Sequence, residues 1–283
     1  MKYKSKIICL RSDGKILNLS DKPWTVSSVQ GIDFPDYELF TEKKGYGDGA
    51  FILGKRKEPR QIEIVALINS ALEEEYKVNR TKALTFFNSN YTFDVEFQRF
   101  GKTRILRDAE IMSAHFPSTW YQKNPELQVC LLSPYSNLFR DSEQSLNLSN
   151  VKNNWHNVRW YTPEHSLVFS TREQSNRLKL DYDGSEPAHV NAEICATGYV
   201  KNIKLRVGDN IAKINVELRN GDNLKIDKFT VYKNNQILNY RNYSMSEIMS
   251  LTLNTGENLI EITTELGDAF DVKITYSAEY GGL

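Results

Sequence analysis

The sequence predicts a mostly β protein with an α+β N-terminal domain, containing one main helix, and a C-terminal β-sandwich. Apolar and polar residues alternate in short runs along most of the chain, and a single stretch has convincing helical spacing. A polar stretch near the middle separates two strand-rich halves. The length of 283 residues, with 40% hydrophobic and 25% charged residues, suits two globular domains with substantial cores.

The first half combines strands with the helix. Residues 62–64 and 93–97 alternate apolar with charged side chains, which predicts half-buried strands. The helix candidate runs from about Asn69 to Phe87, where apolar residues recur at helical spacing. Polar residues at 88–90 predict its end.

The second half reads as a sandwich built from hairpins. Alternation recurs at residues 178–182, 203–207, 214–218 and 270–276, with Gly-Asp or Asn-Gly turn signals between several of them. From about residue 133 to 162 the pattern fails, and the sequence is rich in Asn and Ser. We therefore predict an N-terminal domain at 1–138, a linker at 139–150 and a C-terminal domain at 151–283.

Charge and cysteine content exclude several classes of protein. Thirty-six basic residues balance thirty-six acidic ones, so the chain lacks the basic field of a dedicated nucleic-acid-binding protein. Cys9, Cys130 and Cys195 are an odd, widely spaced set beside apolar residues, which predicts reduced, buried thiols. No apolar run approaches the roughly 18 residues of a membrane span, and none suits a signal peptide. We expect folding in a cytosol.

No motif predicts a catalytic centre, a metal site or a cofactor. The four histidines lack zinc-site spacing. The sequence at 181–185 resembles the start of a calcium loop, but Ala192 occupies the position that needs a bidentate Glu, so a turn is favoured. The glycine-rich stretch at 45–49 lacks the Lys-Ser/Thr of a phosphate loop and leads into a strand pattern. The chain is therefore not expected to be an enzyme.

Two groups of aromatic residues are candidate binding sites in the second half. Such side chains on a β-sandwich can stack on sugar rings or form protein interfaces, although packing inside the sheet is the more common role. The candidates are Trp155, Trp160 and Tyr161, and further along Tyr232, Tyr240 and Tyr243.

The ordered landmarks resemble the distal tail protein (Dit) family of siphophages and Gram-positive prophages, over nearly the whole chain. In the first half these are Gly-Tyr-Gly-Asp-Gly at 45–49, Pro-Arg-Gln-Ile-Glu-Ile at 59–64 and Cys-Leu-Leu-Ser-Pro-Tyr at 130–135. The second half adds the segments at 218–227 and 255–260, and Tyr-Gly-Gly-Leu at 280–283. Thr255 and Ser133 replace the Pro and Asp that the family often has, and neither change prevents a turn.

The resemblance implies a structural hub protein of the virion tail tip or baseplate, made in the host bacterial cytoplasm and used in host adsorption. Its N-terminal domain would form a homohexameric ring that joins the tail tube to tail-associated and receptor-binding proteins. Its C-terminal sandwich would be galectin-like or carbohydrate-module-like, would point outward and would bind partner proteins or host cell-wall carbohydrate. DNA would meet the protein only by passage through the ring lumen.

Within this reading, the segment 48–60 is expected to line the ring interface or the lumen. Its apolar run at 50–53 is flanked by basic residues that suit a lumen through which DNA passes, and the residues singled out are Asp48, Phe51, Lys55, Arg56, Lys57 and Arg60. A core strand followed by a solvated basic turn is nearly as good a reading. Two other classes stay open for the whole chain: a stand-alone carbohydrate-binding β-sandwich protein and a glycan-cleaving enzyme.

Overall fold

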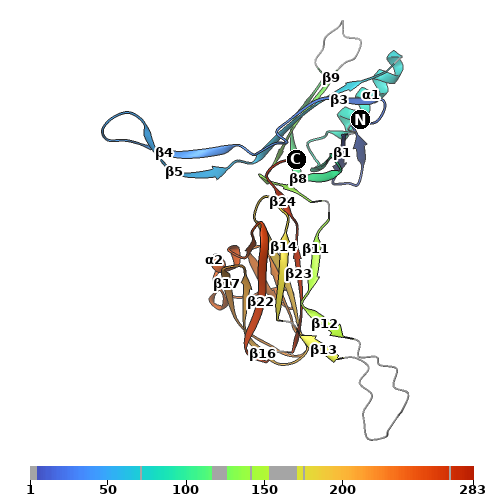
Figure 1. Cartoon of the computed structure of the whole chain (residues 1–283). Helices are drawn as coiled ribbons and strands as arrows, with labels where there is room; N and C mark the ends of the chain where they lie inside the picture. Colours follow the sequence, from blue (N-terminus) through green and yellow to red (C-terminus); the bar gives the residue numbers. More distant parts are fainter. Residues whose placement is uncertain are drawn as a thin grey trace, which may run out of the picture. The chain divides into compact units, whose positions relative to one another are not determined.

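A computed structural model describes residues 5–70, 72–116, 126–140, 142–152, 171–174, 176–267 and 269–283. The chain forms two compact units (Figure 1). The first unit contains Met1–Asp141 together with Glu279–Leu283, and the second contains Ser142–Ala278. The second unit is thus an insertion into the first, because the end of the chain returns to the unit in which the chain begins.

The first unit is built on one antiparallel sheet with the strand order β2-β1-β7-β8-β9-β6-β3. Beside it lie a helix, a separate hairpin of β4 with β5, and a short ladder in which β10 pairs with β8 and β24. The elements are β1 Lys6–Arg11, β2 Ile16–Asn18, β3 Trp24–Gln30, β4 Tyr37–Lys43, β5 Ala50–Lys57, β6 Arg60–Ile68, α1 Glu73–Phe86, β7 Phe93–Arg99, β8 Lys102–His115, β9 Glu126–Ser133, β10 Leu138–Phe139 and β24 Glu279–Tyr280.

Alternation in sequence becomes alternation in burial on this sheet. Every second side chain of β6, β7 and β9 is buried, including Ile62, Ile64 and Phe97. The strands predicted at 62–64 and 93–97 are confirmed. Helix α1 covers part of this core with Ala83 and Phe86. A buried Ile or Phe side chain contributes roughly 1.5–3 kcal/mol relative to an exposed one.

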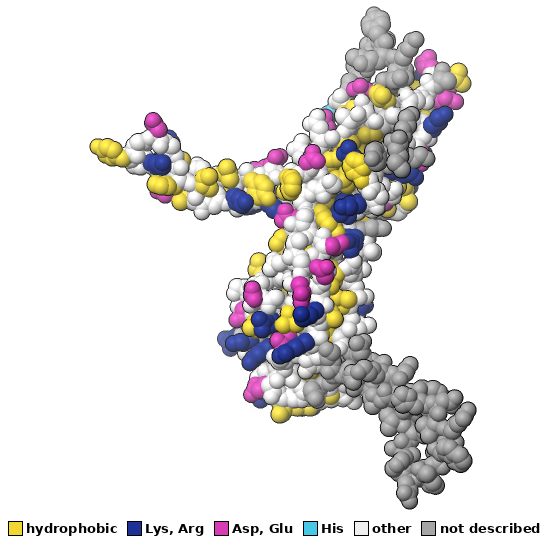
Figure 2. Space-filling view, viewed as in Figure 1, with side chains coloured by type: hydrophobic (Ala, Val, Ile, Leu, Met, Phe, Trp, Pro, Cys, Tyr) yellow, Lys and Arg dark blue, Asp and Glu magenta, His cyan; other side chains and the backbone are white. Residues whose placement is uncertain are grey.

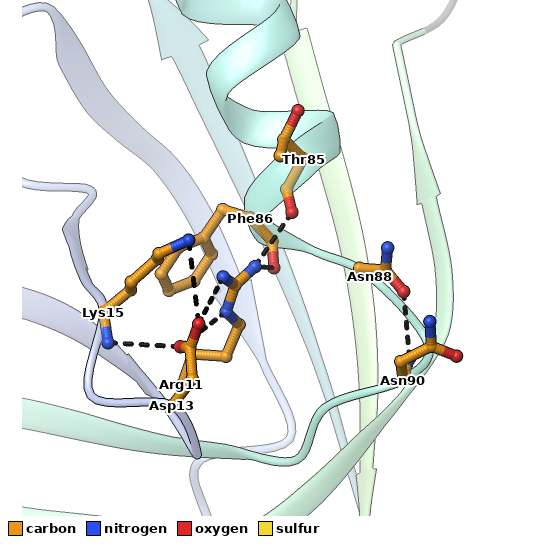
Figure 3. Close-up of polar contacts among 7 residues, drawn as sticks. All are labelled: Arg11, Asp13, Lys15, Thr85, Phe86, Asn88 and Asn90. Carbon is orange, nitrogen blue, oxygen red and sulfur yellow. Dashed lines mark hydrogen bonds and ion pairs between the residues drawn. The ribbon is translucent and has the colours of Figure 1, made fainter.

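Helix α1 is shorter than the predicted 69–87 and is anchored at its C-terminal end by Arg11. The helix begins at Glu73, where three consecutive glutamates favour the positive end of the helix dipole. The buried Arg11 guanidinium donates to the carbonyl oxygens of Thr85 and Phe86 at 2.9 and 3.0 Å (Figure 3). It also forms a bidentate ion pair with Asp13, at 2.7–2.8 Å. Arg11 therefore satisfies carbonyls at the helix end that have no partner within the helix.

The polar stretch predicted to be a linker, 139–150, contains short strands and two buried apolar residues, Phe139 and Leu148. Leu138 and Phe139 form β10 and are buried in the first unit, and Leu148 is buried in the second. Two strands, β11 Gln144–Asn147 and β12 Ser149–Lys152, begin the second unit. Strands this short show no clear periodicity in sequence, so they could not be predicted from it.

The second unit is a sandwich of two antiparallel sheets, ordered β11-β23-β15-β18-β19-β20 and β14-β22-β16-β17. The strands predicted in this half are confirmed as β14, β16, β17 and β23. The remaining elements are β13 Thr171–Gln174, β14 Arg177–Tyr182, β15 Ala188–Ala196, β16 Val200–Val207, β17 Asn210–Leu218, β18 Asn223–Asp227, β19 Thr230–Lys233, β20 Gln236–Ile237, η1 Tyr240–Asn242, α2 Met245–Met249, β21 Thr252–Leu253, β22 Gly256–Leu266 and β23 Phe270–Tyr276.

The three cysteines are free, but they are not all buried as expected. Cys9 is fully buried in the first core, Cys130 is half-buried and Cys195 is exposed. On a strand with one solvated face, an apolar neighbour in sequence points to the opposite face, so proximity in sequence does not predict burial.

Candidate functional site: the exposed hairpin of the first unit

Strands β4 and β5 form a two-stranded sheet of their own. Their register pairs Tyr37 with Lys57 at one end and Lys43 with Ala50 at the other. No side chain of the pair is buried. Figure 1 shows the hairpin extending away from the first unit's sheet. Among the described residues no third strand pairs with it, so both of its edges and both of its faces are open there.

Glycines shape the tip of this hairpin. Gly47 and Gly49 have φ values of +81° and +99°, which residues with a Cβ rarely adopt. The chain can therefore reverse between Lys43 and Ala50 and enter β5 directly. This confirms the expectation that the glycine-rich stretch makes a turn and leads into a strand. Tyr46, at the tip, is 100% exposed.

Large apolar side chains cover the hairpin (Figure 2). Phe51, Ile52 and Leu53 are 58%, 68% and 66% exposed, and Leu39 and Phe40 on the facing strand are also exposed. An isolated two-stranded hairpin is marginally stable at best in water. Contiguous exposed apolar residues mark interaction sites in soluble proteins. The hairpin thus exposes contiguous apolar surface of the kind that marks interaction sites.

A register shift divides the hairpin into two parts. It falls between Phe40 and Thr41, which oppose Gly54 and Ile52, so that Leu53 is left without a partner in the ladder. The part near the tip carries the apolar Phe51 and Ile52 together with the charged Glu42, Lys43 and Asp48. The part near the sheet is basic: Lys55 lies over the Tyr37 ring at 5.2 Å, and Lys57 donates to Asn137 Oδ1 at 3.0 Å.

Most of the residues predicted for the ring interface or lumen lie on this hairpin. Phe51, Lys55 and Arg56 are exposed on β5, and Asp48 is exposed in the turn. Lys57 is half-buried. The alternative reading of 50–53 as a core strand is wrong, because every one of these side chains is exposed.

Arg60 is a correction to that set. It is 2% exposed, and its guanidinium donates to the carbonyl oxygens of Gly31, Asp33, Ser136 and Gly281 at 2.6–2.9 Å. A side chain engaged in this way faces neither a lumen nor a neighbour. Its role is to hold the first unit together.

The aromatic candidates of the second unit are only partly accessible. Tyr240 is 60% exposed, Tyr232 is half-buried, and Tyr243 is buried at 6% with its ring 5.6 Å from that of Tyr240. Tyr243 is therefore a packing residue, and its burial raises the pKa of its phenol. Trp155, Trp160 and Tyr161 lie outside the described residues.

Within the described ranges, no group of three or more His, Cys, Asp or Glu side chains is placed to hold a metal ion. No helix among the described residues is long and apolar enough to cross a membrane. The segment 181–185 begins at the end of strand β14 and places Gly184 against the hydroxyl end of the Tyr182 ring, whose hydroxyl donates to the carbonyl of Glu186 at 2.7 Å. This is the packing of a turn.

The fold has a known counterpart among phage proteins. A crystal structure of the SPP1 Dit protein (gp 19.1), described as a paradigm of the hub adsorption apparatus in phages that infect Gram-positive bacteria, superposes with a TM-score of 0.66. The match covers 96% of this chain and 98% of that one, at 9% sequence identity. The chain has the Dit fold. This confirms the fold expected from the sequence landmarks.

Two structures of the phage P2 baseplate, in its activated conformation with Ca and with Sr, match with TM-scores of 0.43 and 0.40 and about 10% identity, over 97% and 96% of this chain and 98% of each of theirs. No protein-family model and no curated protein matches the sequence. At 9% identity the likeness to the SPP1 Dit protein is one of fold.

Proposed function

We propose that this protein is a structural component of a phage tail tip or baseplate, in which copies of the first unit form a hexameric ring. The Dit fold over almost the full chain supports the tail role. The observation that supports the ring is the β4–β5 hairpin, whose large apolar side chains are exposed.

A ring of identical copies requires a contact between two different patches, repeated until the rotation closes. Six copies need a rotation of about 60° per step. An arm that leaves its own sheet and carries apolar residues supplies one of the two patches. Burial of Phe51, Ile52 and Leu53 against the next copy would contribute roughly 1.5–3 kcal/mol for each side chain.

The basic base of the hairpin is proposed to face the lumen. Lys55 and Arg56 are exposed there and Lys57 is half-buried, while the apolar tip residues lie beyond the register shift. Positive side chains around a channel would suit the passage of DNA, which is densely negative. The ring would join the tail tube to the adsorption proteins, in a virion made in the host cytoplasm.

The second unit is proposed to bind partner proteins or host glycan. Tyr232 and Tyr240 are the accessible members of the candidate set among the described residues, and an exposed aromatic ring suits either contact. A stand-alone carbohydrate-binding protein remains a second candidate. A chain that stays monomeric at all accessible protein concentrations and binds sugar would favour the stand-alone carbohydrate-binding protein over the ring.

The mass of the full chain in solution tests the ring directly. Sedimentation velocity across protein concentrations should show a species six times the 32.7 kDa monomer. The variant Ile52→Glu should remove that species, because a charge would then be buried at the contact. Val78→Glu is the matched control, since Val78 is similarly exposed, at 64% against 68%, but lies on α1. A monomer at every concentration, or equal effects of both variants, would contradict the proposal.

A further inference from the structure

A slot runs along the outer edge of strand β3 in the first unit. It is a cavity of about 440 Å³, and five consecutive residues of β3, 25–29, form one wall. The opposite wall comes from the start of β1 and the end of β7, with Lys6, Phe97 and Arg99. The slot therefore lies between the edge strand β3 and the strands β1 and β7 of the same sheet.

The wall formed by β3 is an unoccupied sheet edge. Strand β3 pairs with β6 on one side and ends the strand order of its sheet on the other. Along the described chain, no strand pairs with this outer edge. An edge of this kind presents a row of backbone N–H and C=O groups to which another extended segment can add.

The end of the chain already uses the continuation of this edge. The backbone N–H of Leu283 donates to the carbonyl oxygen of Ile32 at 3.1 Å, just after β3, and Leu283 also lines the slot. Gly282 lies against the backbone of Asp33, where a Cβ would meet main-chain atoms at 3.1–3.3 Å. The last residues of the chain thus pack against the backbone that directly follows β3. The slot lies beside the preceding residues, 25–29, of the same strand edge.

The charges of the slot select among occupants. Lys6 and Arg99 are its charged side chains, both are basic, and no acidic side chain lines it. Neither Lys6 nor Arg99 has an ion pair among the described residues. We propose that the slot binds an extended segment of another protein, carrying acidic side chains, that adds as a strand to β3. This inference depends on the proposed function in one respect, namely that the chain assembles with other proteins.

Labelled hexapeptides and the full chain test this proposal. The probe is a fluorescein-labelled peptide of alternating Thr and Glu, measured by fluorescence anisotropy. It should bind, whereas the peptide of alternating Thr and Lys and the Thr-Glu peptide with alternate backbone amides methylated should each bind at least ten-fold more weakly. The acidic side chains would be the source of the first difference and the backbone hydrogen bonds the source of the second.

Variants locate the binding. The double variant Lys6→Glu with Arg99→Glu should reverse the preference between the acidic and basic peptides, and Ser27→Phe should fill the slot and abolish binding. Lys82→Glu and Thr81→Phe, at exposed positions on α1, are the matched controls. Equal binding of the methylated peptide, or binding unchanged by Ser27→Phe, would overturn the proposal.

The same variants separate this inference from the ring. If Ser27→Phe removes the hexamer while the Thr-Glu peptide fails to bind the wild-type chain, a second copy occupies the slot and the proposal is wrong. If the peptide binds as expected and the chain is a monomer, the strand-binding proposal is supported and the ring proposal is contradicted.

Discussion

Arg60 Nη2 donates to the carbonyl oxygen of Gly281 at 2.6 Å, although the two residues are 221 positions apart in sequence. The same guanidinium holds Gly31, Asp33 and Ser136 through their carbonyl oxygens. One buried cation therefore fastens the end of the chain, the turn after β3 and the turn before β10 to each other. All of these residues belong to the first unit.

Replacing Arg60 with Met should destabilise the first unit. The change leaves four carbonyl oxygens without their donor, and hydrogen bonds to a charged group contribute about 1.5–3 kcal/mol each, with a total well below the sum because the sites are coupled. We expect a loss of about 3–5 kcal/mol in the free energy of unfolding, as for a broken buried charge network. Urea unfolding monitored by circular dichroism measures it. Arg56→Met, at an exposed position on the hairpin, should change stability by less than about 0.5 kcal/mol.

Deleting residues 279–283 should weaken the first unit even though they are distant in sequence from the rest of it. Tyr280 is buried, the Arg104 guanidinium lies 3.3 Å from the centre of its ring, and Arg140 donates to its hydroxyl at 3.0 Å. A fragment of residues 1–141 should therefore melt at a lower temperature than the same fragment joined by a short Gly-Ser linker to residues 279–283. Equal melting temperatures would show that the returning strand β24 contributes nothing to the fold.

The ion pair of Arg11 with Asp13 should make stability depend on pH in the acid range. The hydrogen bond and charge of Arg11 hold the pKa of Asp13 well below its ordinary value of about 4. A carboxyl group with a lowered folded-state pKa stabilises the protein above its unfolded-state pKa, and this stabilisation is lost as the pH falls through the range below about 4. Asp13→Asn should therefore reduce the melting temperature at pH 7 and narrow its difference from the wild type towards pH 2. A constant difference across this range would contradict the assignment.

The sequence predicted the regular elements better than the features that define the candidate site. Strands with one buried face were predictable, since alternation at 93–97 and 270–276 follows directly from the pleat. The sequence left the run at 50–53 open between an interface or lumen segment and a core strand, and the structure shows that Phe51 and Ile52 are exposed. Arg60 belongs to a basic segment and is therefore predicted to line the lumen, whereas its partners come from three distant parts of the chain, and no local pattern records such a set.

The three thiols should differ in reactivity in an order that burial sets. Cys9 is fully buried, and desolvation raises the pKa of its thiol to about 12. Cys195 is exposed, and its pKa is raised by partial burial and by the charge of Glu193; Cys130 is half-buried, with its pKa likewise raised by desolvation. The thiolate is the reactive species, so a raised pKa and lack of access both lower the reactivity of a thiol.

Mass spectrometry without reductant should show three free thiols. Timed labelling with iodoacetamide at pH 8 should then modify Cys195 first and Cys130 next, with Cys9 modified only after denaturation. Rapid modification of Cys9 in the native chain would show that the first core opens on the timescale of labelling.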